Sequence, residues 1–210
     1  KSDFEFGEFE RLCKIQLDAF KKVSRGRLNY QLLQELKEND DLWWVIGQHH
    51  GLNTPLLDFT RSPFIALFFA FSDIKMNGGN RSIYVIHFHL INQRQQNNNM
   101  PKERHIKLVS PKYLNNLRLI HQAGILLKIP HGQSLEFWFD ENIDYLNHIE
   151  DVQDVLVKKY IIPSDGAKNC LTFLNKMNIN HQTLFPDLEG TAEFCNYLLE
   201  NENYDNYSHY

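Results

Sequence analysis

The sequence predicts an α+β fold with N-terminal helices, a central group of mostly antiparallel strands in a split sheet, and two C-terminal helices. Apolar residues recur at helical spacing up to Phe71, alternate with polar residues after Gly79, and return to helical spacing after Ser164. The predicted strands gather in the middle of the chain without regular alternation with helices. This order favours α+β over a doubly wound parallel sheet.

Three helices are predicted before the first polar link. Phe9 and Phe20 share one face of a helix that opens the chain. A second helix is predicted over residues 28–36 and a third over residues 41–50. Gly51 is expected just beyond the end of the third, because glycine tolerates the left-handed conformation that often ends a helix.

The clearest helix start lies at Ser62-Pro63. Serine is a strong N-cap residue, and proline suits the first helical position. The apolar residues that follow at helical spacing are expected to lie in the main core, and they are Phe64, Leu67, Phe68 and Phe71.

Alternation of apolar and polar residues predicts strands in the middle of the chain. The first is expected over Ser82–Leu90, and the polar, Gln/Asn-rich stretch Asn92–Asn99 is predicted to be a mobile excursion. Further strands are predicted at His105–Val109, Gly124–Ile129, Leu135–Phe139 and Val155–Ile162. The closing helices are predicted at Ser164–Met177 and Pro186–Glu200.

Composition is that of a globular protein. The 210 residues are 42% hydrophobic and 23% charged, with a formal net charge of −4, which disfavours a dedicated duplex-binding protein. The three cysteines form no C-x-x-C pair, and the longest apolar run is too short to span a bilayer. We therefore expect a cytoplasmic protein that does not enter membranes.

One segment carries more reactive groups than packing requires. Between two apolar helices, residues 48–62 hold two imidazoles, a carboxylate, a guanidinium and several hydroxyls. Taken separately, histidines at a helix end often serve its C-terminus, and an aspartate in a turn often accepts from backbone amides. The segment lacks the spacing of metal-binding helices and the nucleophile elbow of serine hydrolases, so no metal is expected.

The segment resembles the signature of the FRG domain family. The matching residues are Gln48-His49-His50-Gly51-Leu52, Thr54, Leu56-Leu57-Asp58-Phe59-Thr60, Ser62-Pro63 and Ala66-Leu67-Phe68-Phe69-Ala70. Two further motifs follow in the same order, Gln122-Ala123-Gly124-Ile125 and Thr183-Leu184-Phe185-Pro186-Asp187-Leu188-Glu189-Gly190. On this basis residues 1–210 are identified as a single FRG-like domain.

Two departures from the family pattern bear on the site. The Phe-Arg-Gly triplet that names the family does not occur in the sequence, so the domain is expected to lack that N-terminal segment. The arginine that follows threonine in the family signature is Pro55 here. Arg61 is the candidate to replace it in space.

The resemblance implies a bacterial or phage-related protein from a toxin or defence system, and we hypothesise a relation to ADP-ribosyltransferases. Such enzymes hold NAD with three separated motifs and act on an oxocarbenium-like centre, which needs orientation and electrostatics more than a strong nucleophile. NAD is then a substrate. The catalytic candidates are His49, His50, Asp58 and Gln122, and the NAD-binding candidates are Thr54, Thr60, Arg61 and Ser62.

Two other classes of function stay open from the sequence alone. A non-enzymatic binding or sensor module would use the same segment as a ligand or partner surface, and a nuclease or other hydrolase is a third class. The acceptor of a transferase would be a protein or a nucleic acid, and an antitoxin or regulatory protein would be a further partner. The transferase hypothesis predicts that one histidine, Asp58, Thr60 and Gln122 face a single cleft.

Overall fold

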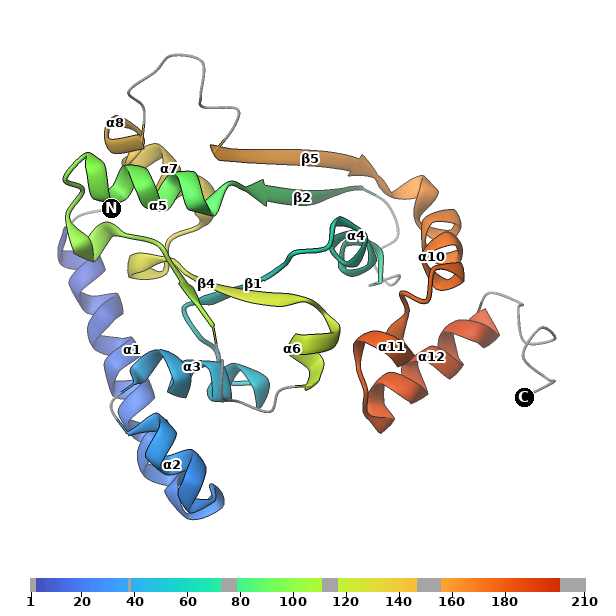
Figure 1. Cartoon of the computed structure of the whole chain (residues 1–210), viewed down its shortest axis with the longest axis horizontal. Helices are drawn as coiled ribbons and strands as arrows, with labels where there is room; N and C mark the ends of the chain where they lie inside the picture. The colour runs from blue at the N-terminus through green and yellow to red at the C-terminus, as the bar shows by residue number, and fades with distance from the viewer. Residues whose placement is uncertain (1–2, 38, 73–78, 111–116, 147–155, 201–210) are drawn as a thin grey trace. The chain divides into compact units, whose positions relative to one another are not determined.

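The computed structural model describes residues 3–37, 39–72, 79–110, 117–146 and 156–200. They form helices and two small antiparallel sheets, so the predicted α+β class is confirmed (Figure 1). The first sheet has the order β1 (Leu56–Thr60), β4 (Gly124–Lys128) and β3 (Lys107–Val109), and the second joins β2 (Asn80–Ile86) to β5 (Val157–Pro163). In the first, β3 runs antiparallel to β4 with Leu108 opposite Leu127.

The chain divides into two compact units. Unit 1 comprises residues 1–58, 86–114 and 125–157, and unit 2 comprises residues 59–85, 115–124 and 158–210. The chain passes from one unit to the other within strands β1, β2, β4 and β5. The assignment of residues 1–210 to a single FRG-like domain stays a prediction.

Unit 1 is built mainly from helices packed around tryptophans. The helices are α1 (Asp3–Ser24), α2 (Tyr30–Leu36), α3 (Asp40–His49), α5 (Phe88–Asn97), α7 (Leu135–Glu141) and α8 (Ile143–Leu146). The indole N–H of Trp43 donates to the Leu36 carbonyl (3.0 Å), and that of Trp138 donates to the Arg104 carbonyl (2.7 Å). Both rings are therefore buried without leaving their polar atom unsatisfied.

The strand predicted to run to Leu90 ends earlier. Helix α5 begins at Phe88, and the His87 imidazole nitrogen accepts from the Leu90 amide (3.2 Å) as its N-cap. A capping side chain satisfies an amide that has no partner within the helix, so the chain turns from strand to helix at this histidine. The prediction of a strand over Phe88–Leu90 is wrong.

The prediction that Asn92–Asn99 is a mobile excursion is also wrong. Most of this stretch is helical, and Ile91 and Gln95, one turn apart, are buried. The Gln95 carboxamide forms two hydrogen bonds with the backbone of Ile106, accepting at 2.8 Å and donating at 3.2 Å. Because glutamine is polar, hydropathy gives no sign that this side chain is buried and bonds to the backbone of a connecting segment. Composition alone therefore suggested a loop.

The strand predicted at Leu135–Phe139 is helix α7. The Ser134 hydroxyl oxygen accepts from the Phe137 amide (3.2 Å), which caps the helix. The buried residues Leu135, Trp138 and Phe139 follow helical rather than alternate spacing. Aromatic content favours strands and misled the prediction, whereas the cap and the spacing identify the helix.

Three predicted strands and both closing helices are confirmed, apart from their ends. The strands are β3, β4 and β5, although Val155 of the last prediction lies outside the described residues. The helices of unit 2 are α4 (Pro63–Phe71), α6 (Leu117–His121), α10 (Ala167–Lys176), α11 (His181–Leu184) and α12 (Leu188–Glu200).

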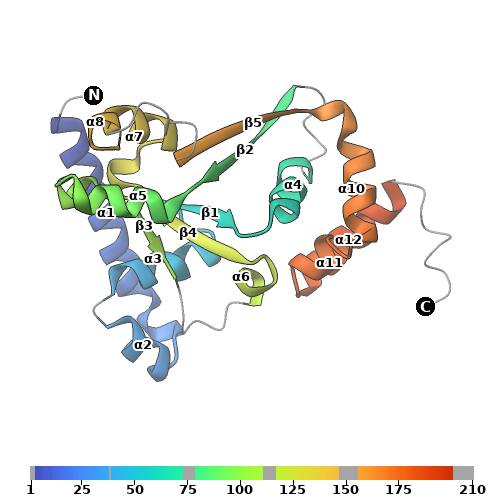
Figure 2. The same cartoon turned by 45° about the horizontal axis from the view of Figure 1, so that its top comes forward.

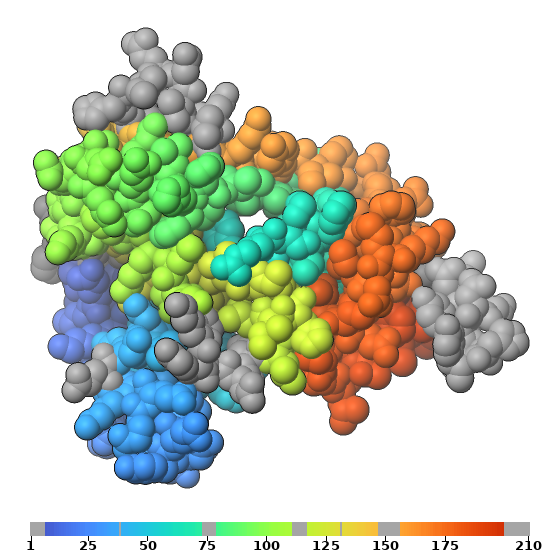
Figure 3. All heavy atoms as spheres, viewed as in Figure 1, coloured from blue at the N-terminus to red at the C-terminus, as the bar shows by residue number. Residues whose placement is uncertain are grey.

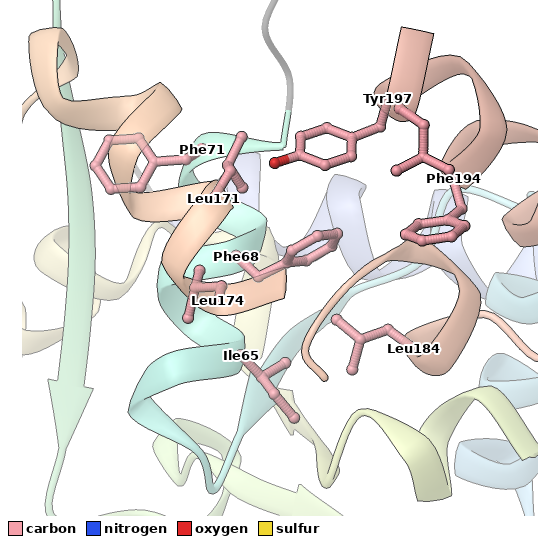
Figure 4. Close-up of a cluster of buried hydrophobic side chains, with 9 residues drawn as sticks. Ile65, Phe68, Phe71, Leu171, Leu174, Leu184, Phe194 and Tyr197 are labelled. Carbon is pink, nitrogen blue, oxygen red and sulfur yellow. The ribbon is translucent and has the colours of Figure 1, made fainter. Parts of the chain in front are cut away.

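One apolar cluster holds unit 2 together, with side chains from α4, α10, α11 and α12 (Figure 4). Its buried members are Ile65, Phe68, Phe71, Leu171, Leu174, Leu184, Phe194, Tyr197 and Leu198. Helix α4 starts as predicted, since Pro63 is its first residue and the Ser62 hydroxyl oxygen accepts from the Ile65 amide (3.3 Å). Phe64 is 47% exposed, so its assignment to the core is wrong. The buried face begins at Ile65.

Candidate functional site

The end of helix α3 has a defined cap. The Leu52 amide donates to the Gly47 carbonyl (2.8 Å) and the Gly51 amide donates to the Gln48 carbonyl (3.0 Å), which is the pattern of a Schellman motif. Gly51 has φ of +83°, as the sequence predicts for the residue after this helix. A Cβ at Gly47 would lie 2.6 Å from Cδ2 of Leu52, so the leucine packs where only glycine fits.

Two imidazoles are exposed at this helix end. The rings of His49 and His50 meet edge to face, with centroids 5.0 Å apart and an interplanar angle of 73°. The cap itself is formed by backbone groups and by the Leu52 side chain. The imidazoles are therefore accessible from solvent and are not needed to fill a core.

The Gln48 carboxamide connects two other polar residues of the segment. Its oxygen accepts a hydrogen bond from the Thr54 hydroxyl, and its nitrogen donates to Oδ2 of Asp58 (2.9 Å). Thr54 also accepts from the Leu56 amide (3.3 Å) at the start of β1. These bonds fix which side of the amide faces the carboxylate, and they orient Asp58. Sequence reasoning gave Gln48 no role, although the motif begins with it.

Asp58 is an exposed residue whose carboxyl is partly desolvated by the surrounding protein. Burial raises the pKa of the Asp58 carboxyl, and the hydrogen bond from Gln48 opposes that rise without cancelling it. A carboxylate with a raised pKa is a stronger base than a free aspartate. Unit 1 thus presents an oriented carboxylate in the same segment as two exposed imidazoles.

The predicted NAD-binding residues of unit 2 join the end of β1 to the start of β4. The Thr60 hydroxyl donates to the Gln122 carbonyl (2.7 Å) and accepts from the Ser62 amide (3.1 Å). The Arg61 amide donates to the Ala123 carbonyl (3.0 Å). Thr60 and Ser62 therefore fix the turn from β1 into α4 and take part in the cap of that helix.

The side chain of Gln122 serves the fold of unit 2. Its nitrogen donates to the Leu184 carbonyl (3.2 Å), the last residue of α11. That carbonyl is one of the groups a helix leaves without a partner at its C-terminal end. Gln122 thus contributes to the attachment of α11.

The closing motif is organised by an arginine that sequence reasoning missed. The Arg118 guanidinium pairs with Asp187 (2.7 Å) and Glu189 (2.8 Å) and lies 5.5 Å from the centroid of the Phe185 ring. The hydrogen bond from Arg118 is the largest of the effects that lower the pKa of Asp187. Asp187 Oδ1 also accepts from the Gly190 amide (2.9 Å) at the start of α12. Two acidic residues in the first turn of the helix predicted at Pro186–Glu200 were the available signal.

Gly190→Ala is expected to destabilise the protein by about 2 kcal/mol or more, because overpacking of this kind costs about 1–3 kcal/mol. A Cβ at Gly190 would lie 2.2 Å from the Phe185 carbonyl oxygen and 2.9 Å from that of His181, and backbone atoms cannot move aside cheaply. Gly166→Ala is the control, since nothing lies within 4 Å of its added Cβ. Denaturant unfolding of both variants measures the difference; equal stability would contradict the close packing.

His181 is sandwiched between two phenylalanines of unit 2. Its ring centroid lies 4.9 Å from that of Phe68, edge to face, and 5.9 Å from that of Phe185, stacked. Burial lowers the pKa of His181, and Glu193 opposes the shift. The neutral imidazole is therefore the form that suits the folded state.

Stability is expected to fall as pH drops through the range in which His181 titrates. Because its folded pKa lies below the ordinary value of about 6.5, its contribution is intact above that value and is lost at lower pH. His181→Phe keeps an aromatic ring and should lose less stability than wild type between about pH 7.5 and 5. The same replacement at an exposed histidine, His121→Phe, controls for the loss of one imidazole. Parallel pH profiles for His181→Phe and wild type would contradict the assignment.

The predicted site residues fall into two groups. His49, His50, Thr54 and Asp58 lie in unit 1, and Thr60, Arg61, Ser62 and Gln122 lie in unit 2. Within unit 1 the structure joins Thr54 to Asp58 through Gln48, and within unit 2 it joins Thr60 to Gln122. The predicted convergence of the two groups on one cleft stays a prediction.

In the part of the chain that the structure describes, no group of three or more His, Cys, Asp or Glu side chains is arranged to hold a metal ion. None of the described helices combines the length and apolar character needed to cross a bilayer.

The fold and the site define a class of protein, namely an α+β protein whose surface carries a segment of oriented polar groups. Residues 6–78 match the family model of the FRG domain. The match supports the resemblance that the motifs predicted, and it includes the whole segment from Gln48 to Ser62. Gln122 and the closing motif lie beyond the matched residues. Comparison with curated proteins and with solved structures found no match.

Proposed function

We propose that this FRG-domain chain is an ADP-ribosyltransferase-like enzyme in which residues 48–58 activate the acceptor. One observation carries the proposal. The Gln48 carboxamide bridges the Thr54 hydroxyl and the Asp58 carboxylate, and it holds an exposed carboxylate in a fixed orientation. A carboxylate with a structural role at a surface turn usually accepts hydrogen bonds from backbone amides. The Asp58 carboxylate instead accepts from the Gln48 side chain, which in turn accepts from the Thr54 hydroxyl.

The chemistry assigned to the segment is proton transfer at the acceptor. The bond between nicotinamide and the ribose C1 of NAD breaks, and nicotinamide leaves with the electron pair. The acceptor nucleophile forms the new bond to C1, and its proton passes to the Asp58 carboxylate. The raised pKa of Asp58 suits this role, because a general base works best when its pKa approaches the working pH.

The neighbouring imidazoles have a supporting role in this proposal. His49 and His50 are exposed and follow Gln48 directly in the chain. An imidazole can donate to a phosphate or ribose oxygen of NAD in its neutral or its charged form. Either histidine would then orient the dinucleotide, and orientation is the main requirement of a reaction that passes through an oxocarbenium-like centre.

The test uses chromatography to measure the release of nicotinamide from NAD. A protein extract or a nucleic-acid pool serves as the acceptor. Wild type should release nicotinamide and label the acceptor with ADP-ribose. The double variant His49→Ala/His50→Ala should lower the rate by about tenfold or more. His89→Ala, an exposed histidine on α5, should leave it unchanged. Wild type that neither binds NAD nor releases nicotinamide would overturn the proposal.

A non-enzymatic binding module is the second candidate, and a specific observation favours it. Gln122, one of the catalytic candidates for the transferase, donates its side-chain N–H to the Leu184 carbonyl and so takes part in the fold. A module that binds a ligand through the exposed segment of unit 1 needs no group at that position. NAD binding without nicotinamide release, abolished by His49→Ala/His50→Ala, would establish the module in place of the enzyme.

A further inference from the structure

Helix α1 packs against the rest of unit 1 through one of its faces. Leu17 is buried on this face, and the Phe20 ring meets that of Trp43 in α3 edge to face, with centroids 6.2 Å apart. The Phe9 ring lies against Gly132. In both views of the molecule α3 lies on one side of α1 (Figures 1 and 2). This face therefore accounts for the attachment of α1 to unit 1.

A second apolar stripe runs along the solvent side of the same helix. Its members, called here the outer stripe, follow one another at intervals of three or four residues and so share one face, and they are Leu12, Ile15, Ala19 and Val23. Ala19 is exposed, and the three larger side chains are 51%, 52% and 65% exposed. Atoms of α1 reach the surface in the space-filling view (Figure 3). A surface helix usually has a single apolar stripe, which faces the core, so a second one indicates a binding surface.

The charges of α1 change sign along its length. Residues 3–12 contain four acidic residues and one basic residue, whereas residues 13–27 contain five basic residues and one acidic residue. The helix macrodipole favours this polarity within a single helix, but it does not explain the apolar residues between the charged ends. Two such helices that run in opposite directions place the acidic half of each beside the basic half of the other. A parallel pair would bring like charges together.

We propose that the outer stripe of α1 binds the outer stripe of a second copy of this chain, with the two helices antiparallel. The contact is isologous, because the same surface is used by both copies. A two-fold axis near Ile15 sets Leu12 of one copy against Ala19 of the other, a large side chain against a small one. The paired segment, residues 8–23, is about 24 Å long, which makes a small interface. We therefore expect a dissociation constant on the order of 10–100 µM.

The same arrangement lays Glu8 of one copy beside Lys22 of the other. Lys22 is exposed on α1. Glu8 pairs with Arg11 of its own helix (2.7 Å), and a carboxylate has about four acceptor positions. Lys22 can therefore join this pair without displacing Arg11. The charges select the antiparallel orientation, and the outer stripe supplies the apolar burial.

Sedimentation equilibrium of the full chain between about 1 and 500 µM tests the proposal. Wild type should form a dimer as its concentration rises. Ile15→Glu sets two carboxylates against each other on the axis and should weaken the dimer at least about tenfold. Leu199→Glu is the matched control, because it makes the same kind of change at an exposed aliphatic residue of α12, and it should leave the dimer unchanged. A monomer at every concentration, or equal loss in the control, would overturn the proposal.

Charge exchange tests the pairing of the two ends. Glu8→Lys and Lys22→Glu should each weaken the dimer about fivefold at low salt, because each variant sets like charges against each other twice. An equimolar mixture of the two variants should restore the dimer, since every lysine then faces a glutamate. Circular dichroism confirms that each variant is folded. A mixture that dimerises no better than its components would overturn the proposed pairing.

Cysteine cross-linking tests the orientation. Under mild oxidation Ile15→Cys should give a covalent dimer, because its two thiols meet on the axis. Val23→Cys should not, because antiparallel helices hold these two positions about 24 Å apart, beyond the reach of a disulfide. Wild type, with its three free cysteines, is the reference. Cross-linking at both positions would overturn the proposal in favour of a parallel pair, and cross-linking at neither would place the contact elsewhere. None of these outcomes depends on NAD chemistry.

Discussion

Gln95→Ala is expected to lower the free energy of unfolding by about 2–5 kcal/mol, although it changes one polar residue in a polar stretch. The side chain is 1% exposed and satisfies both the amide and the carbonyl of Ile106. Its removal leaves a buried donor and a buried acceptor without partners, at a cost of about 1–3 kcal/mol each. Small domains are stable by only about 5–15 kcal/mol, so the loss would be a large fraction of the total.

The neighbouring residue supplies the control for that experiment. Gln96 follows Gln95 in the same helix and is exposed, so Gln96→Ala should change stability by no more than about 0.5 kcal/mol. Denaturant unfolding with a common reference gives both values. If Gln95→Ala matched Gln96→Ala, the buried carboxamide would have no structural role, and the original expectation of a peripheral loop would regain support.

Local capping chemistry could be predicted from the sequence wherever the side chains that make it are adjacent. Ser62-Pro63 gave the start of α4, and Gly51 gave the end of α3, because a cap involves residues within a few positions of one another. Gln95 could not be found in this way. Its partner is Ile106, eleven residues further on, and only the folded chain shows that a connecting segment depends on it.

The same distinction explains how far the site could be predicted. The motif identified the segment and its resemblance to a family, since both are properties of residues in sequence. It did not show that Gln48 orients Asp58 or that Arg118 holds the closing motif, because those bonds join residues ten and about seventy positions apart. Motif residues proved to be of two kinds. Gln122, Asp187 and Gly190 make bonds or contacts within the fold of unit 2, whereas His49, His50 and Asp58 are exposed.

Asp58→Asn is expected to lower nicotinamide release by about 100-fold or more, the range for loss of a positioned general base, with no loss of stability. An asparagine oxygen can still accept from Gln48, so the segment should keep its geometry. The sign of the stability effect follows from the pKa. Burial raises the pKa of Asp58, so the ionised form is disfavoured in the folded state and costs stability once the pH exceeds the ordinary carboxyl value of about 3.9. A neutral amide avoids that cost at neutral pH.

Asp140→Asn provides the matched control, because it makes the same chemical change at an exposed position of α7 in unit 1. It should alter neither the rate nor the stability. Measured together, rate and unfolding free energy separate the two roles that Asp58 could have. A residue kept for the fold loses stability when its charge is removed, whereas a residue kept for chemistry loses activity and keeps or gains stability. If Asp58→Asn unfolded the protein, the Thr54–Gln48–Asp58 chain would be a structural clamp. If the variant stayed both stable and active, the proton would go elsewhere, and the exposed imidazole of His49 or His50 would be the next base to remove.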